Sequence, residues 1–230
     1  MSASWYTRRW TAGVLLMIAV LLGAAGVLPA DEETCHFLWE QANARTAAAR
    51  TPEEYLDAAQ AYQQIVREGV RNGTLFYNLG TTLLLAGDGE NAVAALRRAE
   101  RYLGSTPDIR INLRQAMALQ AGRPDTDLPW DRTILFWHYD EPVRVRALVA
   151  MCGWLLLWLA ILLRLLTRAP AAGKTSGAVI SLAKTCLLFG LLLCVLFSSS
   201  TAVSLLQEQM DERTWQDRTF TSKPPPEQHP

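Results

Sequence analysis

Three long apolar blocks constrain the fold of this chain more than any other feature of its 230 residues. The blocks cover residues 11–28, 147–163 and 185–206, and the second extends to 166 past Arg164. A helix of about 20 apolar residues crosses the hydrocarbon core of a bilayer. The sequence therefore predicts two transmembrane helices, at 147–166 and 185–206.

The first block is typical of an export signal. Arg8 and Arg9 precede 18 uncharged residues, and Leu28-Pro29-Ala30 follows as a small-residue exit. Leu28 fits the usual Ala-x-Ala cleavage pattern poorly, and 18 residues can just span a bilayer. Residues 1–30 are therefore expected to be a cleaved signal peptide or an uncleaved signal anchor. Both alternatives send the next segment across the membrane.

The charge distribution predicts which side each segment occupies. Basic residues flank and fill the stretch between the second and third blocks, which has no acidic residue: Arg164, Arg168, Lys174 and Lys184. Because short cytoplasmic loops carry an excess of Lys and Arg, this stretch is expected inside. Residues 31–146 and the tail after 206 are then expected outside.

Composition narrows the class of protein further. Hydrophobic residues make up 50% of the chain and charged residues only 19%, below the roughly 25% of soluble domains. The 22 basic residues balance the 22 acidic ones, so the chain lacks the net positive charge that nucleic-acid binding requires. We expect a membrane-tethered protein in contact with lipid and without a nucleic-acid partner.

A repeat occupies the polar region between the first two blocks. A shift of 34 residues superposes matching positions, namely Ala58 on Ala92, Tyr62 on Leu96, Ile65 on Ala99 and Asn78-Leu79 on Asn112-Leu113. This period with helical patterning is the signature of the tetratricopeptide repeat. The predicted fold class is all-α: a short tetratricopeptide array at 31–125, followed by two transmembrane helices.

Cap residues place the helices of this array at 35–49, 52–68, 73–86, 89–103 and 107–121. Thr51 and Glu54 form a predicted capping box, and Thr106 precedes a helix in the same way as Thr51. Gly87 ends one helix and Asp88 caps the next. Small residues, Gly80 and Ala92, are expected where two helix backbones approach. The array then has two repeats and a single terminal helix as its cap.

The first helix of each repeat lines the concave face of such arrays. By register, the predicted partner-binding groove consists of Asn43, Tyr77, Asn78, Thr81, Asn112 and Gln115. The set has no cluster of cations, which a groove for a terminal carboxylate would offer. We expect an extended partner segment held by backbone hydrogen bonds and stacking on Tyr77. The alternative is that these side chains are solvated or pack against the membrane helices.

Three further expectations concern residues in or beside the spans. An aromatic strip precedes the first span and is expected at the lipid headgroups: Trp130, Phe136, Trp137, His138 and Tyr139. Ser198–Thr201 in the last span bond either to a neighbouring helix or to their own backbone. Asp211 and Glu212 are expected to be solvated charges.

Residues for catalysis or metal binding do not assemble into a known pattern. Three of the four cysteines lie in predicted spans, which leaves Cys35 alone, and the chain has three histidines. No CxxC, HExxH or phosphate-binding glycine loop occurs. We therefore expect a protein that is not an enzyme, with no cofactor and no metal.

The predicted organisation has seven segments. They are a signal segment (1–30), the repeat array (31–125), an aromatic juxtamembrane segment (126–146), a span (147–166), a basic cytoplasmic loop (167–184), a second span (185–206) and a polar, proline-rich tail (207–230).

This order, together with several local motifs, resembles BatE-like proteins of the bacterial aerotolerance (Bat) family. The motifs are residues 76–80, 87–88, Ala92, 96–101 and 107–113, the strip 137–139 and the span 154–166. The resemblance covers most of residues 31–206. It implies a non-catalytic scaffold in the bacterial cytoplasmic membrane, with its array on the periplasmic side.

The resemblance also implies partners, namely von Willebrand factor A-domain membrane proteins and a MoxR-type AAA+ ATPase. Family members often end in a small SH3-like β domain, whose pattern residues 207–230 do not show. An alternative function is that of an assembly factor for envelope enzymes, for example in cytochrome maturation. The absence of CxxC weighs against that alternative.

Overall fold

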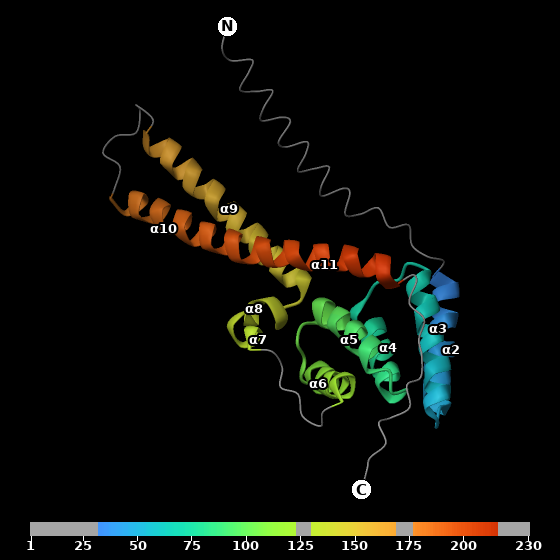
Figure 1. The fold of residues 1–230 in the computed structure, drawn as a ribbon. Coiled ribbons are helices and arrows are strands. Elements are labelled where there is room, and N and C mark those ends of the chain that lie inside the picture. Colours follow the sequence, from blue (N-terminus) through green and yellow to red (C-terminus); the bar gives the residue numbers. More distant parts are fainter. Residues whose placement is uncertain (1–31, 123–129, 169–176, 216–230) are drawn as a thin grey trace.

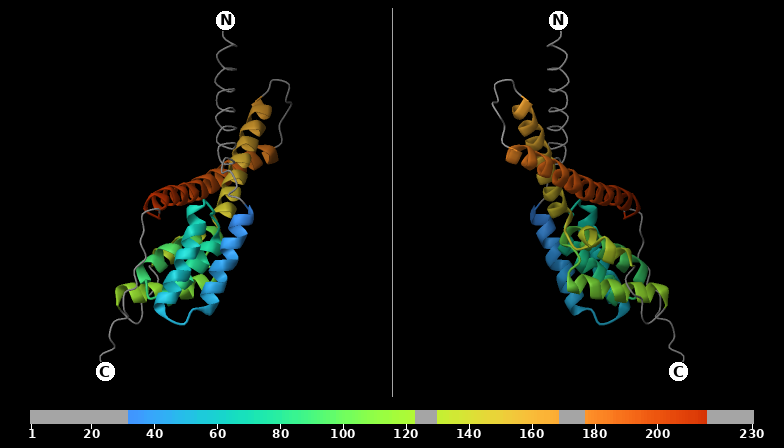
Figure 2. Two further views of the ribbon diagram at one scale, coloured as in Figure 1. Left: turned by 90° about the vertical axis from the view of Figure 1, so that its right-hand side faces the viewer. Right: turned by 90° about the vertical axis from the view of Figure 1, so that its left-hand side faces the viewer.

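The computed structural model describes residues 32–122, 130–168 and 177–215 (Figure 1). The signal segment, residues 123–129, residues 169–176 of the basic loop and the end of the tail lie outside these residues. Every regular element in the described part is a helix. Helices α2–α6 form one body, and α9–α11 form a long hairpin that rises from it (Figures 1 and 2).

The five predicted helices of the first body are confirmed, each boundary within three residues. They are α2 (Glu32–Ala48), α3 (Pro52–Arg67), α4 (Gly73–Leu85), α5 (Gly89–Leu103) and α6 (Pro107–Ala121). The expected caps explain this agreement. Thr51 and Glu54 complete a capping box, and Asp88 and Thr106 accept hydrogen bonds from the third residue beyond them. Gly87 ends α4 with a φ of 81°.

These helices pack as antiparallel neighbours around an apolar core. Small residues allow the close contact between α4 and α5, as predicted. Ala92 is fully buried, and a Cβ on Gly80 would lie 2.7 Å from Leu96 Cγ and 3.1 Å from its backbone nitrogen. One core residue within the described part, Trp215, comes from outside α2–α6, because the end of α11 packs onto this body.

Two short helices, α7 (Asp131–Ile134) and α8 (Phe136–Tyr139), lead into α9 (Val143–Arg168). Helix α9 packs antiparallel to α10 (Gly177–Leu193). Glycines permit this contact, because a Cβ on Gly190 would lie 2.9 Å from the Gly153 carbonyl oxygen. Both helices expose large apolar side chains along their length and are long enough to cross a membrane.

The second apolar helix is much longer than the sequence predicts. A π-helical turn (Cys194–Ser198) joins α10 to α11 (Ser199–Trp215), so 39 residues from Gly177 to Trp215 are helical. At about 1.5 Å per residue this length is roughly 58 Å, nearly twice a bilayer core of about 30 Å. The boundary at 206 is predicted from the apolar composition of the span. The helix continues beyond it because its polar end packs on α4 and α5.

Candidate interaction surfaces

The predicted groove residues on α4 and α6 bond to one another. The amide nitrogen of Asn112 donates to the Tyr77 hydroxyl at 3.3 Å and to Thr81 Oγ1 at 3.0 Å. These contacts tie α4 to α6. Gln115, one turn further along α6, is exposed.

A second polar cluster surrounds Tyr62 of α3 and contains two further groove residues, Asn43 and Asn78. The Tyr62 hydroxyl donates to Asn43 Oδ1 at 2.6 Å. Burial raises the pKa of Tyr62, and hydrogen bonds with Thr46 and Asn78 offset part of that rise. The structure thus brings five of the six predicted residues into two interhelical clusters. Part of their hydrogen-bonding capacity is used within the chain, and their role in partner binding stays a prediction.

The described part of the chain has two notable cavities, and neither is lined by the predicted groove residues. An open one of about 460 Å³ lies between α2 and α3. The other, of about 480 Å³, lies where α5, α7, α8 and α11 meet. Its charged lining is balanced, with three arginines and three carboxylates: Arg97, Arg101, Arg132, Glu100, Asp131 and Asp211. It therefore favours neither a simple anion nor a simple cation.

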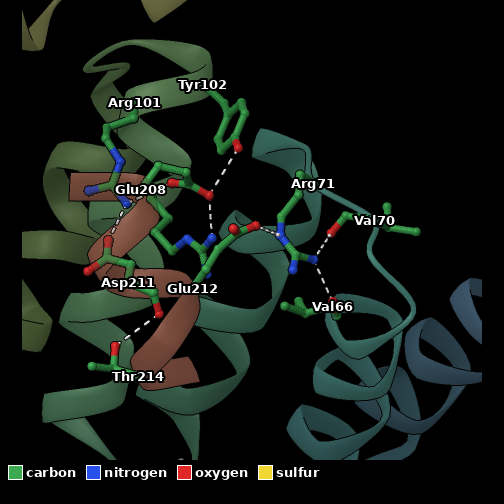
Figure 3. Close-up of polar contacts among 10 residues, drawn as sticks. Val66, Val70, Arg71, Arg101, Tyr102, Glu208, Asp211, Glu212 and Thr214 are labelled. Carbon is green, nitrogen blue, oxygen red and sulfur yellow. Dashed lines mark hydrogen bonds and ion pairs between the residues drawn. The ribbon is translucent and has the colours of Figure 1, made fainter. Parts of the chain in front are cut away.

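Helix α11 contacts the array through a buried ion pair that the sequence did not predict. Arg98 of α5 is fully buried and pairs through Nη2 with Glu208 Oε1. Its guanidinium also lies 4.2 Å from the centre of the Phe76 ring. The Tyr102 hydroxyl donates to the same Glu208 oxygen at 3.1 Å (Figure 3). Burial, followed by the Glu208 charge, raises the pKa of Tyr102 to about 12.

More exposed ion pairs surround this inner one (Figure 3). Arg101 pairs with Glu208 at 3.0 Å and with Asp211, and Arg71 Nε lies 3.0 Å from Glu212 Oε1. The side chains of Asp211 and Glu212 are 36% and 46% exposed, against 18% for Glu208. Because exposed pairs contribute little, the outer pairs add less than the inner one. Asp211 and Glu212 are thus partly solvated, as predicted, and they also form ion pairs with the array that the sequence did not predict.

An aromatic anchor completes the contact. Trp215 is only 3% exposed, and its ring centre lies 6.4 Å from that of Phe76, which stacks on Tyr102 at 5.9 Å. The α11 residues that contact the array are Glu208, Asp211, Glu212 and Trp215. Their spacing of i, i+3, i+4 and i+7 places them on one helix face. That spacing is visible in the sequence, but it does not identify the surface on which this face packs.

A buried polar cluster joins the two ends of the hairpin. Arg146 in the first turn of α9 is fully buried and donates to His138 Nδ1 at 2.9 Å and to Ser200 Oγ at 2.8 Å. Burial first, and then the charges of Arg146, Arg101 and Arg132, lower the pKa of His138. Imidazole here is neutral, with Nδ1 as the acceptor.

The two alternatives for the serine run are both realised in part. Ser200 bonds across to α9, as described, whereas Ser199 Oγ and Thr201 Oγ1 donate to the carbonyls of Val195 and Phe197 in their own helix. Ser200 Oγ also lies 2.8 Å from His138 Nδ1. Base catalysis would need this imidazole to become positively charged, which the adjacent Arg146 opposes. The contact between His138 and Ser200 therefore connects α8 to α11.

The aromatic strip divides into an outer and an inner set. Trp130 and Phe136 are exposed. Tyr139 points inward, with its hydroxyl donating to Asp131 Oδ2 at 2.8 Å and its ring under the Arg132 guanidinium at 4.4 Å. Arg132 also pairs with Glu100 of α5. Tyr139 and Arg132 therefore attach α7 and α8 to the array, whereas Trp130 and Phe136 stay exposed.

The geometry defines a helical protein with two helices that are long and apolar enough to cross a membrane. In the described residues, no group of three or more His, Cys, Asp or Glu side chains is placed to hold a metal ion. Comparisons with protein-family models, curated proteins and solved structures find no match for this chain. Its function must therefore be inferred from its own residues and contacts.

Proposed function

We propose that this chain is a membrane-anchored adaptor whose short tetratricopeptide array holds a segment of a partner protein outside the cytoplasmic membrane of a bacterium. One observation carries the proposal. Two antiparallel helix pairs, α2 with α3 and α4 with α5, follow one another and α6 packs against the second pair, with Gly80 and Ala92 at the contact between α4 and α5. Stacked pairs of this kind create an extended concave surface, which is the usual binding face of helical repeats.

The face formed by α2, α4 and α6 is the proposed binding groove. It offers amides from Asn43, Asn78, Asn112 and Gln115 and a hydroxyl from Thr81, with Tyr77 as its aromatic side chain. Amides both donate and accept, so they suit the alternating groups of an extended backbone. The bonds from Asn112 to Tyr77 and Thr81 support this function because they hold the face in one arrangement before a partner arrives.

The experiment that tests the groove replaces Asn78 and Asn112 together with alanine. We expect the solubilised variant to capture its partner proteins several-fold less well while its helical content is unchanged. Loss of the Asn112 bonds should cost about 1–2 kcal/mol of stability, so a thermal melt accompanies the capture assay. The matched control replaces exposed Thr74 on α4 and exposed Arg114 on α6. Full retention of every co-purifying protein by the double variant would remove the groove from this proposal.

The resemblance to the Bat family supports a narrower form of the proposal. In this form, the partners are von Willebrand factor A-domain membrane proteins that work with a MoxR-type AAA+ ATPase. Cross-linking in intact cells, followed by purification of this chain, tests it. Recovery of proteins of neither class would leave an adaptor function with other partners.

A further inference from the structure

The array has a second surface with the properties of a recognition site, separate from the groove. It consists of Arg71, Arg98 and Arg101 together with the Phe76 and Tyr102 rings, and we refer to it as the arginine–aromatic surface. In the intact chain the end of α11 covers it (Figure 3). Arginine and large aromatic residues are the types that most often dominate the energy of protein interfaces.

The segment on this surface contacts it in the way that a bound helical peptide contacts a groove. Its four contact residues, Glu208, Asp211, Glu212 and Trp215, occupy positions i, i+3, i+4 and i+7. The side chains between them point away, since Gln209, Met210, Arg213 and Thr214 are all exposed. A single helix face with anchors at this spacing is how amphipathic helices are recognised in grooves.

The chemistry of the surface specifies an acidic helix. Within the described residues, Glu208 is the one carboxylate that pairs with buried Arg98, whose Nε and Nη1 have no hydrogen-bond partner. A neutral helix in this place would leave a buried positive charge uncompensated, which is strongly unfavourable. The Trp215 ring lies against Phe76, with ring centres 6.4 Å apart, so an aromatic side chain one turn beyond the acidic residues completes the pattern.

The structure also provides a point at which α11 can move. The π-helical turn at Cys194–Ser198 lies between the membrane part of the helix and the segment on the array. Helices bend at such turns, and π-turns are frequent at functional sites. The outer carboxylates, Asp211 and Glu212, are partly exposed and therefore weakly held.

We propose that the arginine–aromatic surface recognises acidic amphipathic helices, that α11 is its intramolecular ligand, and that a helix of a partner protein with the same pattern displaces α11. The pattern is a carboxylate at i, i+3 and i+4 and an aromatic residue at i+7. Because α11 is tethered, its effective concentration is high. The surface is thus closed to weak ligands and opens to a partner that is concentrated or tightly bound.

The test uses the full chain in detergent micelles and a synthetic peptide of residues 204–215. Excess peptide should accelerate amide hydrogen exchange in the α11 segment of the wild-type chain by displacing it. A control peptide carries Glu208→Gln, Asp211→Asn, Glu212→Gln and Trp215→Ala, and it should have no effect. Unchanged protection of α11 at saturating peptide, or an equal effect of the control peptide, would overturn the proposal.

A second measurement uses variants of the chain itself, with peptide binding followed by fluorescence anisotropy. The Glu208→Gln/Trp215→Ala chain should bind the labelled peptide at least tenfold more tightly than the wild type, because its intramolecular competitor is weakened. Adding Arg101→Gln should reverse that gain. The matched control, Met210→Ala/Arg213→Gln, changes exposed residues of the same helix and should bind as the wild type does.

Binding by the Glu208→Gln/Trp215→Ala chain that is no tighter than that of the wild type would contradict the proposal, provided that circular dichroism shows an intact array. Light scattering tests whether the arginine–aromatic surface binds a second copy of this chain instead of a partner protein. A dimer that dissociates when the peptide is added would assign the surface to self-association and overturn the proposed partner. If the groove variant still captures its partners, only the proposed adaptor function is contradicted, because the two surfaces share no residue.

Discussion

Two arginines, Arg98 and Arg146, are completely buried, and they differ in what compensates their charge. Arg98 has the carboxylate of Glu208, whereas Arg146 donates to neutral acceptors on His138 and Ser200. Among the described residues no carboxylate forms an ion pair with Arg146. Buried guanidinium groups without a counter-charge are costly, so the neutral state of His138 is essential to this cluster.

This environment predicts how stability depends on pH. The unfolded chain takes up a proton on His138 near pH 6.5, but the folded chain does so only at lower pH, because burial and Arg146, Arg101 and Arg132 oppose it more than Asp131 favours it. The free energy of unfolding should therefore fall as the pH drops below about 6.5. Thermal melts between pH 8 and 5 measure this slope.

The variant His138→Asn serves as the comparison, since it keeps an acceptor near the position of Nδ1 and removes the titration. Its stability should vary less over the same pH range. Identical slopes for both chains would show that His138 does not titrate with folding.

Overpacking the contact between α4 and α5 should destabilise the array. A Cβ on Gly80 would already meet Leu96, and Ala92 has no free space around it. We expect Gly80→Leu and Ala92→Leu each to cost about 1–3 kcal/mol of unfolding free energy. Chemical denaturation of the full chain measures this, with exposed Ala44→Leu as the control. Unchanged midpoints for both variants would contradict the repeat register.

At the scale of elements, α11 belongs to the array as well as to the hairpin. Its end supplies Trp215 to the apolar core that α2–α6 otherwise build among the described residues. An isolated fragment of residues 31–125 would lack this side chain and expose Phe76 and Arg98, which it covers. The array and the second span are therefore expected to unfold cooperatively.

Replacement of Trp215 by alanine tests this relation. We expect a loss of about 3–5 kcal/mol, as for other buried tryptophans, and a clear drop in the melting temperature of the array. Met210→Ala on an exposed face of the same helix should change stability by less than about 0.5 kcal/mol. Equal effects of the two substitutions would argue against Trp215 as a core residue.

The helices of the array could be predicted from sequence because their signals are local. Thr51, Asp88 and Thr106 each cap a helix within three residues, and Gly87 needs only its own backbone conformation. The α11 contact could not be predicted in the same way. Arg98 and Glu208 are 110 residues apart, and the polar composition after residue 206 is also that of a solvated tail.

The candidate site was likewise predictable only in part. The repeat register brought together Tyr77, Thr81 and Asn112, which the structure places in contact. Register alone does not show that these side chains bond to one another. The position of Arg146 in the sequence, next to the predicted membrane helix, also does not reveal its environment, which is a buried cluster built from α8, α9 and α11.

At the scale of the whole molecule, both ends of the hairpin meet the array. Arg146 near the start of α9 contacts Ser200 of α11, and the other end of α9 and the start of α10 lie far from the array (Figure 1). If the hairpin spans the membrane, the array and those two helix ends therefore lie on opposite sides. The basic residues between the spans then favour an external array.

Cysteine labelling tests this topology. In a chain without its four native cysteines, Asp108→Cys on exposed α6 should react with an impermeant maleimide in intact spheroplasts. Ser176→Cys, which lies outside the described residues, should react only after permeabilisation. Labelling of Ser176→Cys in intact spheroplasts would reverse the assignment.

The unbroken run of helix from Gly177 to Trp215 has a mechanical consequence. Helix α11 has 17 residues, so its lever arm beyond the π-helical turn is roughly 26 Å. A rotation of about 10° at that turn would move its tip by roughly 4 Å, enough to separate Trp215 from the array. Helices tilt to match bilayer thickness. If α9 and α10 cross a membrane, a change of tilt with bilayer thickness would therefore alter how α11 lies on the array.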